Sequence, residues 1–514
     1  MDNIDWLNYK RYLHIDRPIE PGDIPKVIAY IRNPKAVAKH PFLPLVRRVE
    51  KILKFKSVSE CARKKYTIKK RPLTFAGHLD ANIYSYYASI LQEKYENFVT
   101  SHDLNDVAVA YRRIPVDPAK PKKGNKCNIE IAHDAFVTIQ SMLNECGEVR
   151  VFTYDIKGFF DNLDHDILKS QWCAIQGYEK RLPADEFHVF ESVTDYAYIF
   201  EQALFYHFKD KIVCKRNDGT IVNRRVRHRG YLRDSGAIAY CEKTDIKEIR
   251  DAHLINTRSH KNGERIGIPQ GLPISAVLAN IYMSSFDVEV NSIVVSHGGM
   301  YKRYSDDIII ALPGDVDADS VNAQVHEAIA KVKLIIESHK TQRYVLTRLD
   351  EKVTCQQIQP DESLRLSSIE YLGFSFDGNR VLLKNATLGK YYHKIQRHVR
   401  YATRMAICIK NPRTKGSLFF GRLLHLYSYS GAETHGVYTR CKKNGRFVFE
   451  KSKRKSWGNF VTYARKSNRI MHEPDIIRQL RRNRHKLKKL IQNSQNTIHV
   501  ALPQVPIKWY VKKL

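Results

Sequence analysis

Cysteine is scarce in this chain, and its spacing argues against two classes of protein. The 514 residues include nine cysteines, an odd number, and none pair at the spacing of metal ligands. Small secreted folds depend on many disulfides, and zinc modules need closely spaced ligand pairs. We therefore expect a reduced, cytoplasmic protein, and a chain of this length can bury a core in several subdomains.

Long apolar runs are also missing. No stretch reaches the length of a membrane span. The first residues, Met1–Trp6, carry neither a basic start nor the apolar centre of a secretion signal. We expect no membrane partner.

Acidic residues are few, above all in the C-terminal quarter. The chain has 86 Lys or Arg against 54 Asp or Glu, a net charge of +32. Residues 384–514 hold 31 of these bases and only four acids, so this quarter alone carries +27. Such an excess repels itself unless a polyanion is near, which predicts a nucleic-acid partner.

The basic quarter is not a disordered arm, because aromatic residues are interleaved with its charges. Its patterns predict helices over residues 391–409, 419–429 and 476–491. The last helix carries five bases that we expect to contact nucleic acid, although a solvated helix face is the alternative: Arg481, Arg482, Arg484, Lys488 and Lys489.

Two of the scarce acids stand side by side. Arg303–Asp307 contains Asp306 and Asp307 and is followed by the apolar run Ile308–Leu312. This pattern predicts a β-hairpin with both acids at its turn, where they can point to one place. Carboxylate oxygens are ligands for Mg²⁺, which also binds substrate phosphates. Taken alone, the pair is more often an exposed acidic turn.

Two further segments suggest that this pair is a site. In Val151–Asp161, apolar residues lead to Asp155, which is predicted to end a strand; a helix cap is the alternative. In Gly267–Tyr282, Pro and Gly residues form a loop before a helix that begins near Ser275, a candidate N-cap. An ordinary loop–helix junction is the other interpretation of that segment.

In this order, the three segments resemble the palm of reverse transcriptases, and the resemblance extends from about Arg71 to Gly378. Tyr371–Phe376 is similar to the primer-grip hairpin of that family, which implies that Leu372 and Gly373 are primer-grip residues. Lys352 resembles the lysine that follows the catalytic hairpin, and Lys340 is a competing choice.

The resemblance implies an α+β, right-hand polymerase fold. Residues 1–150 would form the N-terminal region and fingers, and residues 151–383 a palm with an antiparallel sheet and an insert at about 168–265. Residues 384–514 would form a basic, mainly α-helical thumb or C-terminal extension.

The resemblance also implies roles for single residues. Asp155 and Asp306 would bind two Mg²⁺ ions, with Mn²⁺ as a substitute; Asp307 and Ile156 would complete the metal site. Phe160, with Phe159 as the second choice, would exclude a 2′ hydroxyl, and Gln270 would lie near the nascent pair. Arg112, Arg113 and Lys126 resemble the basic residues that hold the triphosphate in the fingers.

The implied function is RNA-directed DNA synthesis, with an RNA template, dNTPs and a cDNA product. Phe75–Tyr87 is similar to the fingers of bacterial defence-associated, abortive-infection enzymes, which predicts antiphage defence with a dedicated non-coding RNA. Ala276 disfavours a diversity-generating enzyme, which has Gln there. An intron-type enzyme that assists splicing and a non-catalytic RNA-binding protein remain alternatives. The sequence leaves self-association open.

Two other patterns have more than one interpretation. His78 and Asp80 would form either a catalytic pair or structural hydrogen bonds near a helix start. Within the insert, residues 187–208 are predicted to be helical, and Asn217–Gly219 predicts a hairpin turn. Several arginines follow that turn, as a basic element near the substrate channel or as a surface loop.

Overall fold

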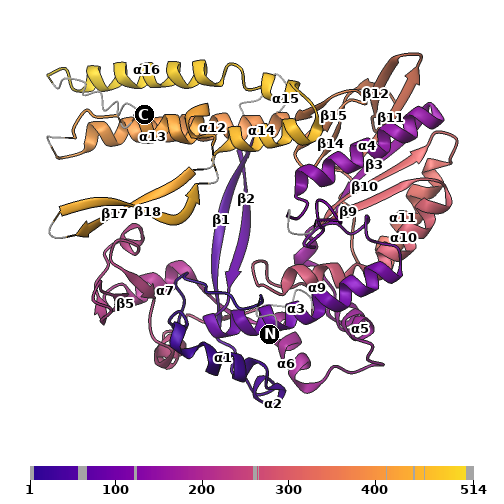
Figure 1. Cartoon of the computed structure of the whole chain (residues 1–514). Coiled ribbons are helices and arrows are strands. Elements are labelled where there is room, and N and C mark those ends of the chain that lie inside the picture. Colours follow the sequence, from indigo (N-terminus) through magenta and orange to yellow (C-terminus); the bar gives the residue numbers. More distant parts are fainter. Residues whose placement is uncertain are drawn as a thin grey trace.

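The computed structural model describes residues 5–55, 66–120, 124–258, 263, 265–411, 414–418, 420–433, 435–443, 446–456 and 458–504. Its centre is a six-stranded antiparallel sheet in the order β13-β12-β11-β3-β10-β9, the palm sheet (Figure 1). Its strands are β3 (Glu148–Asp155), β9 (Met300–Tyr304), β10 (Asp307–Pro313), β11 (Gln342–Leu349), β12 (Lys352–Ile358) and β13 (Leu364–Leu366).

Both faces of the palm sheet are covered, which explains the uninterrupted apolar run in β10. Ile308 and Ile310 pack into one core with α9 (Ser275–Tyr282), α10 (Ser284–Ser296) and α11 (Ala318–Lys331). Ile309, between them, points to the opposite face and packs with α4 (Asn128–Cys146). Alternate side chains of a strand face opposite sides, so a doubly covered strand is apolar at every position.

The fingers side is built on a long β-hairpin and one long helix. The hairpin pairs β1 (Leu45–Phe55) with β2 (Tyr66–Phe75), and α3 (His78–Ser101) follows it directly. Two short helices, α1 (Ile24–Ile31) and α2 (Pro34–Val37), precede the hairpin. The hairpin rises between the fingers helices and the C-terminal helices (Figure 1).

The insert folds onto this hairpin. After α5 (His165–Gln176) and α6 (Ala184–Thr194), strand β4 (Ala197–Phe200) pairs in parallel with β1. The sheet order is β2-β1-β4-β8, where β8 is Asn256–Thr257. The helix predicted over residues 187–208 is confirmed at its two ends, in α6 and α7 (Glu201–Phe208), and is wrong between them, where β4 separates the two helices.

The rest of the insert is a small sheet in the order β6-β5-β7, followed by α8 (Ile246–Asp251). It contains β5 (Ile212–Lys215), β6 (Ile221–Arg224) and β7 (Ala237–Ala239). The predicted turn at Asn217–Gly219 is confirmed, since it joins β5 to β6 and Gly219 has φ +90°.

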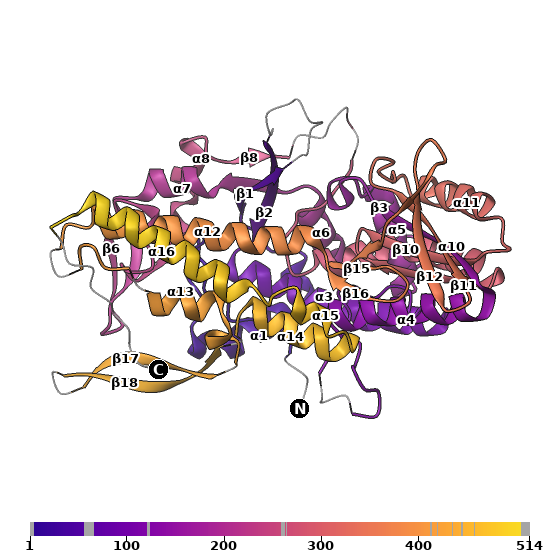
Figure 2. The same ribbon diagram turned by 90° about the horizontal axis from the view of Figure 1, so that it is seen from above.

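A three-stranded meander directly precedes the C-terminal quarter, which is built mainly of helices. The meander is β14 (Ile369–Tyr371), β15 (Phe374–Phe376) and β16 (Val381–Leu383). The helices are α12 (Asn385–Cys408), α13 (Phe420–Tyr427), α14 (Phe460–Met471), α15 (Asp475–Arg478) and α16 (Asn483–Ala501). Seen from above, α12 and α16 run side by side (Figure 2).

Two predictions for this quarter need correction. The helix expected over residues 476–491 is two helices, because the chain turns at Arg481 and Arg482 before α16 begins. A hairpin of β17 (His435–Lys443) and β18 (Arg446–Ser456) also interrupts the helices, and the sequence patterns did not indicate it. Among the helices that the structure describes, none is long and apolar enough to cross a membrane.

Candidate active site

Three carboxylates meet where β3 ends and β10 begins. Asp155 and Asp307 are register partners on these adjacent strands. Asp306 lies in the two-residue turn between β9 and β10, and its carbonyl accepts a hydrogen bond of 3.1 Å from the Ile156 amide. The structure thus brings together Asp155, Ile156, Asp306 and Asp307, which the sequence assigned to one metal site.

A buried ion pair fixes the turn that carries Asp306. Arg303 and Asp287 are fully buried and form hydrogen bonds of 2.7 and 2.5 Å. The same guanidinium donates to the carbonyl of Ser305, which adopts a left-handed conformation with φ +62°. Removing one partner of such a pair would leave an uncompensated buried charge, so the turn is held firmly.

The clustering of acids changes their protonation. Burial, followed by the charges of Asp306 and Asp155, raises the pKa of Asp307 to about 6. Burial and the charge of Asp155 also raise the pKa of Asp306, while Lys69 opposes that shift. Carboxylates that destabilise one another in their charged forms favour a cation between them.

The donor set fits Mg²⁺. Within the described part of the chain, no three His, Cys, Asp or Glu side chains form a group that could hold an ion by themselves. Mg²⁺ commonly takes only one or two carboxylates and completes its shell with water and substrate phosphates. The oxygens of Asp155 and Asp306 could supply that partial shell.

The lysine beside the acids is Lys340, and the assignment of Lys352 is corrected. The Lys340 amine forms an ion pair with Asp155. Burial lowers the pKa of Lys340, but the hydrogen bond and charge of Asp155 outweigh it and raise that pKa. Thr347 is the register partner of Glu148, at the opposite end of β3 from Asp155, and Lys352 lies beyond Thr347. Lys352 is therefore roughly 20 Å from Asp155.

The turn after Asp155 is tied to the Pro-Gln-Gly loop. Phe159 is buried, whereas Phe160 is partly exposed, and its carbonyl accepts a 2.8 Å hydrogen bond from the Ile268 amide. The carbonyl of Gln270 accepts from the amide and hydroxyl of Thr74, at the end of β2. The predicted nucleotide-contacting residues Phe160 and Gln270 therefore belong to one connected surface.

The loop reaches β2 so closely that only glycine fits next to Gln270. Gly271 has φ +112°, and a Cβ there would lie 2.6 Å from the Thr74 carbonyl oxygen. Ser275 is the first residue of α9 and not its N-cap, so that prediction was one residue off; its hydroxyl donates to the Pro269 carbonyl at 2.6 Å.

Of the three bases predicted to hold the triphosphate, Arg112 does not fit that role. Its guanidinium is almost fully buried and donates to Glu96, Asn105 and the Ala108 carbonyl, which occupy all its N–H groups. Arg113 is 77% exposed, and Lys126 pairs with Asp134 at 2.8 Å. The triphosphate-binding roles of Arg113 and Lys126 therefore remain predictions.

The charges of Lys69 and Lys384 also reach the acids, and sequence reasoning missed both. Lys69 lies on β2, in the basic run Lys69–Arg71, and its charge acts on Asp306. Lys384 follows β16 and acts on Asp307. The basic run was a usable signal for Lys69, but nothing in the sequence showed that β2 reaches the palm.

The predicted primer-grip residues form the tight turn between β14 and β15. Leu372 and Gly373 both have positive φ, at 46° and 93°. The Leu372 carbonyl accepts from Asn128 at 3.2 Å, and that of Gly373 accepts from the Lys384 amide at 3.0 Å. The charge of Asp307 contributes to the raised pKa of Tyr371, so this hairpin lies near the acids.

His78 and Asp80 do not form a catalytic pair. His78 bonds to Asp16 at 2.8 Å, whereas Asp80 accepts from His40 and from the Leu43 amide, both at 2.9 Å. All of these groups tie the N-terminal residues to the start of α3. The structural interpretation of the two residues is therefore confirmed.

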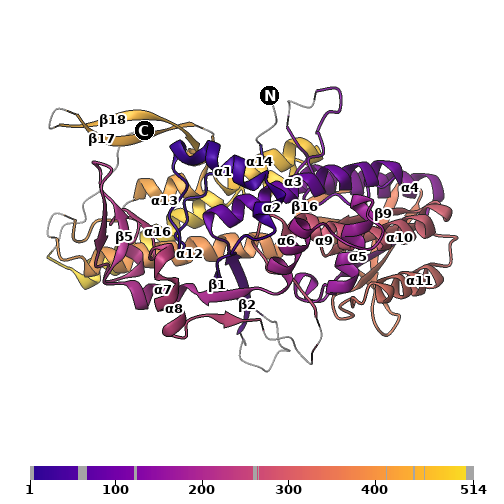
Figure 3. The same ribbon diagram turned by 90° about the horizontal axis from the view of Figure 1, so that it is seen from below.

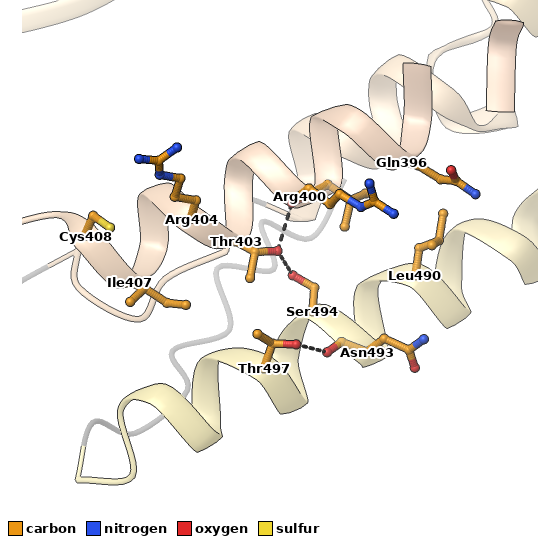
Figure 4. A pocket seen from close by; sticks show the side chains of 11 residues that line it. Gln396, Arg400, Thr403, Arg404, Ile407, Cys408, Leu490, Asn493, Ser494 and Thr497 are labelled. Atoms are coloured by element: carbon orange, nitrogen blue, oxygen red, sulfur yellow. Dashed lines mark hydrogen bonds between the residues drawn. The ribbon is translucent and has the colours of Figure 1, made fainter. Parts of the chain in front are cut away.

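The basic residues predicted to contact nucleic acid are all exposed: Arg481, Arg482, Arg484, Lys488 and Lys489. The opposite side of α16 is buried through Leu487, Ile491 and Ile498. Between α16 and α12 lies a cavity of about 520 Å³, which the Thr403 and Ser494 hydroxyls bridge (Figure 4). The two helices are thus joined through one face, and the bases lie outside it.

The fold and the site together define a right-hand polymerase of the α+β class. Residues 224–376 match the family described as reverse transcriptase (RNA-dependent DNA polymerase). This segment, less than a third of the chain, is therefore similar to a reverse transcriptase domain. The match includes Asp306 and Asp307 but begins after most of the insert, which separates Asp155 from the other motifs.

No curated protein matches the sequence. Among solved structures, the chain is similar to apo telomerase from Candida tropicalis truncated from the C-terminal domain, at 11% identity and TM-score 0.35, over 71% of this chain and 61% of that one. The chain is also similar to telomerase from Candida albicans in complex with the TWJ fragment of telomeric RNA, at 11% identity and TM-score 0.34, over 95% of this chain and 65% of that one.

The RNA-dependent RNA polymerase of a human picobirnavirus gives 11% identity and TM-score 0.30, over 64% of this chain and 43% of that one. The chain spans about three fifths of the length of the first telomerase structure.

Proposed function

We propose that this protein is an RNA-directed DNA polymerase that makes cDNA by two-metal nucleotidyl transfer. The observation that carries the proposal is that Asp155, at the end of β3, lies beside Asp306 and Asp307 of the β9–β10 turn, and that the chain after Asp155 is bonded to the Pro-Gln-Gly loop. Phosphoryl transfer requires mainly positioning and charge neutralisation from a protein, and this arrangement offers both.

Each residue of the site has a distinct task in this proposal. Asp155 and Asp306 would hold Mg²⁺ or Mn²⁺, which when bound stabilises charge on the attacking 3′ oxygen and the leaving diphosphate. Lys340 neutralises Asp155 and steers its carboxylate. Arg113 and Lys126 would contact the triphosphate, and Leu372 and Gly373 the primer strand.

Phe160 supports a preference for deoxynucleotides. Its ring is partly exposed and contacts the ring of Phe159, which is buried in the core. A bulky ring under the incoming sugar leaves no room for a 2′ hydroxyl. Phe160→Ala should therefore raise ribonucleotide incorporation relative to deoxynucleotide incorporation in single-nucleotide extension assays. An unchanged ratio in an active variant would reject Phe160 as the gate.

The activity is tested with a primed RNA template, dNTPs and Mg²⁺. Asp155→Asn or Asp306→Asn should lower incorporation at least about a thousandfold, because losing a metal ligand costs several kcal/mol of transition-state stabilisation. The matched control is Asp350→Asn at the far end of the sheet, where the residue has φ +55° and Asn is tolerated. Near-normal synthesis by the Asp155 or Asp306 variant would refute the proposal.

The setting we propose is bacterial antiphage defence, in the cytoplasm, with a dedicated non-coding RNA. The similarity of Phe75–Tyr87 to defence-associated enzymes supports it. Sequencing the RNA and DNA that co-purify with the protein, with and without phage infection, tests it. One recurrent RNA with its complementary cDNA is the expected result; intron RNA would favour the splicing enzyme, and RNA without cDNA a non-catalytic binder.

A further inference from the structure

The insert presents a run of arginines that the catalytic proposal does not use. Residues 224–233 contain five arginines and no acid: Arg224, Arg225, Arg227, Arg229 and Arg233. All five are exposed, as are His228 and Tyr231, and Tyr231 exposes 56% of its surface. We call residues 224–233 the arginine segment.

The backbone of the arginine segment is anchored, so its side chains are displayed from a fixed frame. Val226 and Leu232 are buried in the core of the insert. The Val226 amide donates to the Lys209 carbonyl at 2.7 Å, and Arg224 is the register partner of Ile212 in β5. Two buried residues, Val226 and Leu232, thus alternate with exposed arginines. This pattern indicates a surface that binds a polyanion.

Most of this charge is not neutralised within the protein. Arg229 pairs with buried Glu201, and Arg225 lies 2.8 Å from exposed Asp210. Among the described residues, no carboxylate lies within ion-pair distance of Arg224, Arg227 or Arg233. Guanidinium groups match phosphate oxygens, and an exposed tyrosine offers a face on which a base can stack.

The position of the arginine segment suggests which nucleic acid it meets. The β5–β6 sheet lies on the side of the β1–β2 hairpin away from the palm sheet, at the same end of the molecule as β17–β18 (Figures 1 and 3). Residues 435–456, which form that second hairpin, contain eight bases and one acid. Two basic elements therefore flank one end of the molecule, apart from the carboxylates.

We propose that the arginine segment binds the unpaired RNA template ahead of the copying site. Copied template leaves as a duplex with its product, whereas template that has not been copied is single-stranded and approaches from another direction. This inference rests on the proposed function, because only a polymerase has a template. The binding of RNA to the arginine segment can nevertheless be measured without synthesis.

The test uses the full chain and measures binding by fluorescence anisotropy without nucleotides. Two probes share one RNA–DNA duplex: one is blunt and the other has a long single-stranded RNA template overhang. The variant replaces Arg224, Arg225, Arg227 and Arg233 by Gln and leaves Arg229 with Glu201. The matched control removes four exposed bases of the palm: Lys331, Arg348, Lys352 and Arg365.

The expected result is weaker binding of the overhang probe and unchanged binding of the blunt probe. The salt slope for the overhang probe should become shallower by about 2 to 3, because each phosphate contact on single strands contributes about 0.7. An Arg→Lys version of the variant should keep that slope. Equal losses in the palm control or equal losses on the blunt probe would each overturn the inference.

The readouts separate this inference from the proposed function. If the wild-type protein makes no DNA but the variant loses overhang binding, the surface stands and the polymerase proposal fails. If synthesis on a short template is normal and overhang binding is unaffected by the substitutions, the polymerase proposal stands and the arginine segment is only a solvated loop.

Discussion

At the scale of single residues, three carboxyl groups lie close together at the palm turn. Burial and mutual repulsion disfavour their charged forms. Asp306 and Asp307 follow one another in the chain, and Asp155 is the strand partner of Asp307. The pKa values of both Asp306 and Asp307 are raised, so these carboxyl groups resist full ionisation. Charge repulsion of this kind costs stability, and a cation bound under the proposed function would relieve it.

Asp307→Asn should therefore stabilise the protein at neutral pH. The pKa of Asp307 rises from 3.8 to about 6, so the folded state binds the extra proton and stability falls as pH rises across that interval. The cost is complete above pH 6 and absent below about pH 4. Neighbouring groups crowd the Asp307 carboxyl and partly desolvate it, but the residue as a whole is exposed to solvent, and screening should limit the gain to about 1 kcal/mol or less.

Thermal melts from pH 4 to pH 8 in the presence of a chelator would measure this gain. Asp350→Asn, at an exposed turn far from the cluster, is the control and should show no pH-dependent difference. A variant less stable than wild type at pH 8 would show that Asp307 contributes structure and not repulsion.

The two candidate lysines give a second prediction at this scale. Lys340→Met should reduce nucleotide incorporation by at least tenfold, because it removes the cation paired with Asp155. Lys352→Met removes the same charge at the other end of the sheet and should leave incorporation within about twofold of wild type. Steady-state extension assays at saturating Mg²⁺ compare them. Equal effects of both substitutions would refute the assignment.

The acids could be recognised from sequence because their spacing and strand context are specific, whereas the correct lysine could not. Choosing Lys340 over Lys352 requires the register of β11 against β3, and that register depends on pairings distant in sequence. Arg112 shows the same limit, since nothing nearby in the sequence reveals that Glu96 and Asn105 occupy its guanidinium.

At the scale of elements, local pattern predicted well where an element is stabilised by its own periodicity. The helices near residues 391–409 and 419–429 are confirmed as α12 and α13, with α12 beginning earlier. Predictions failed where a distant strand decides the outcome. Residues 197–200 are extended because they pair with β1, which lies about 150 residues earlier in the chain.

The exposed bases at the start of α16 give the prediction at this scale. Replacing Arg481, Arg482, Arg484, Lys488 and Lys489 by Gln should weaken RNA binding and flatten its salt slope by up to about one unit per lost contact. Helix propensity should be kept, since Gln is a good helix former and the buried face is untouched. Extension of a saturating primed template should persist.

A charge-preserving variant is the control for that experiment, with each Arg changed to Lys and each Lys to Arg. Its salt slope should equal that of the wild type. If the Gln variant also binds RNA with wild-type affinity and slope, this side of α16 is a solvated surface and has no part in nucleic-acid binding.

At the scale of the whole molecule, the insert is joined to the β1–β2 hairpin by a few buried polar contacts. Glu201, at the start of α7, is 6% exposed and accepts hydrogen bonds from Arg48 on β1, from Arg229 and from the Tyr240 hydroxyl. It therefore joins the fingers hairpin to the arginine segment.

The ionised form of Glu201 stabilises this junction. Burial alone would raise its pKa, but hydrogen bonds from Arg48 and Tyr240 and the charges of both arginines outweigh that effect and lower it. The carboxylate therefore contributes stability above its ordinary pKa of 4.5, and the contribution is lost as pH falls through the lower folded value.

Glu201→Gln should destabilise the protein at pH 7 by about 1 to 2 kcal/mol, because it leaves two half-exposed arginines without a counter-charge. The deficit should shrink as pH falls below 4.5, because the carboxyl group of the unfolded wild-type chain then binds a proton that the folded form takes up only at lower pH. If the junction orients the arginine segment, the same variant should bind the overhang probe less tightly than wild type while binding the blunt probe equally.

The control is Glu248→Gln, which removes an exposed ion pair with Lys211 in the same insert and should cost little. Equal melting curves for the Glu201 and Glu248 variants would mean that the insert docks on the fingers through its strand pairing alone, without help from the buried carboxylate.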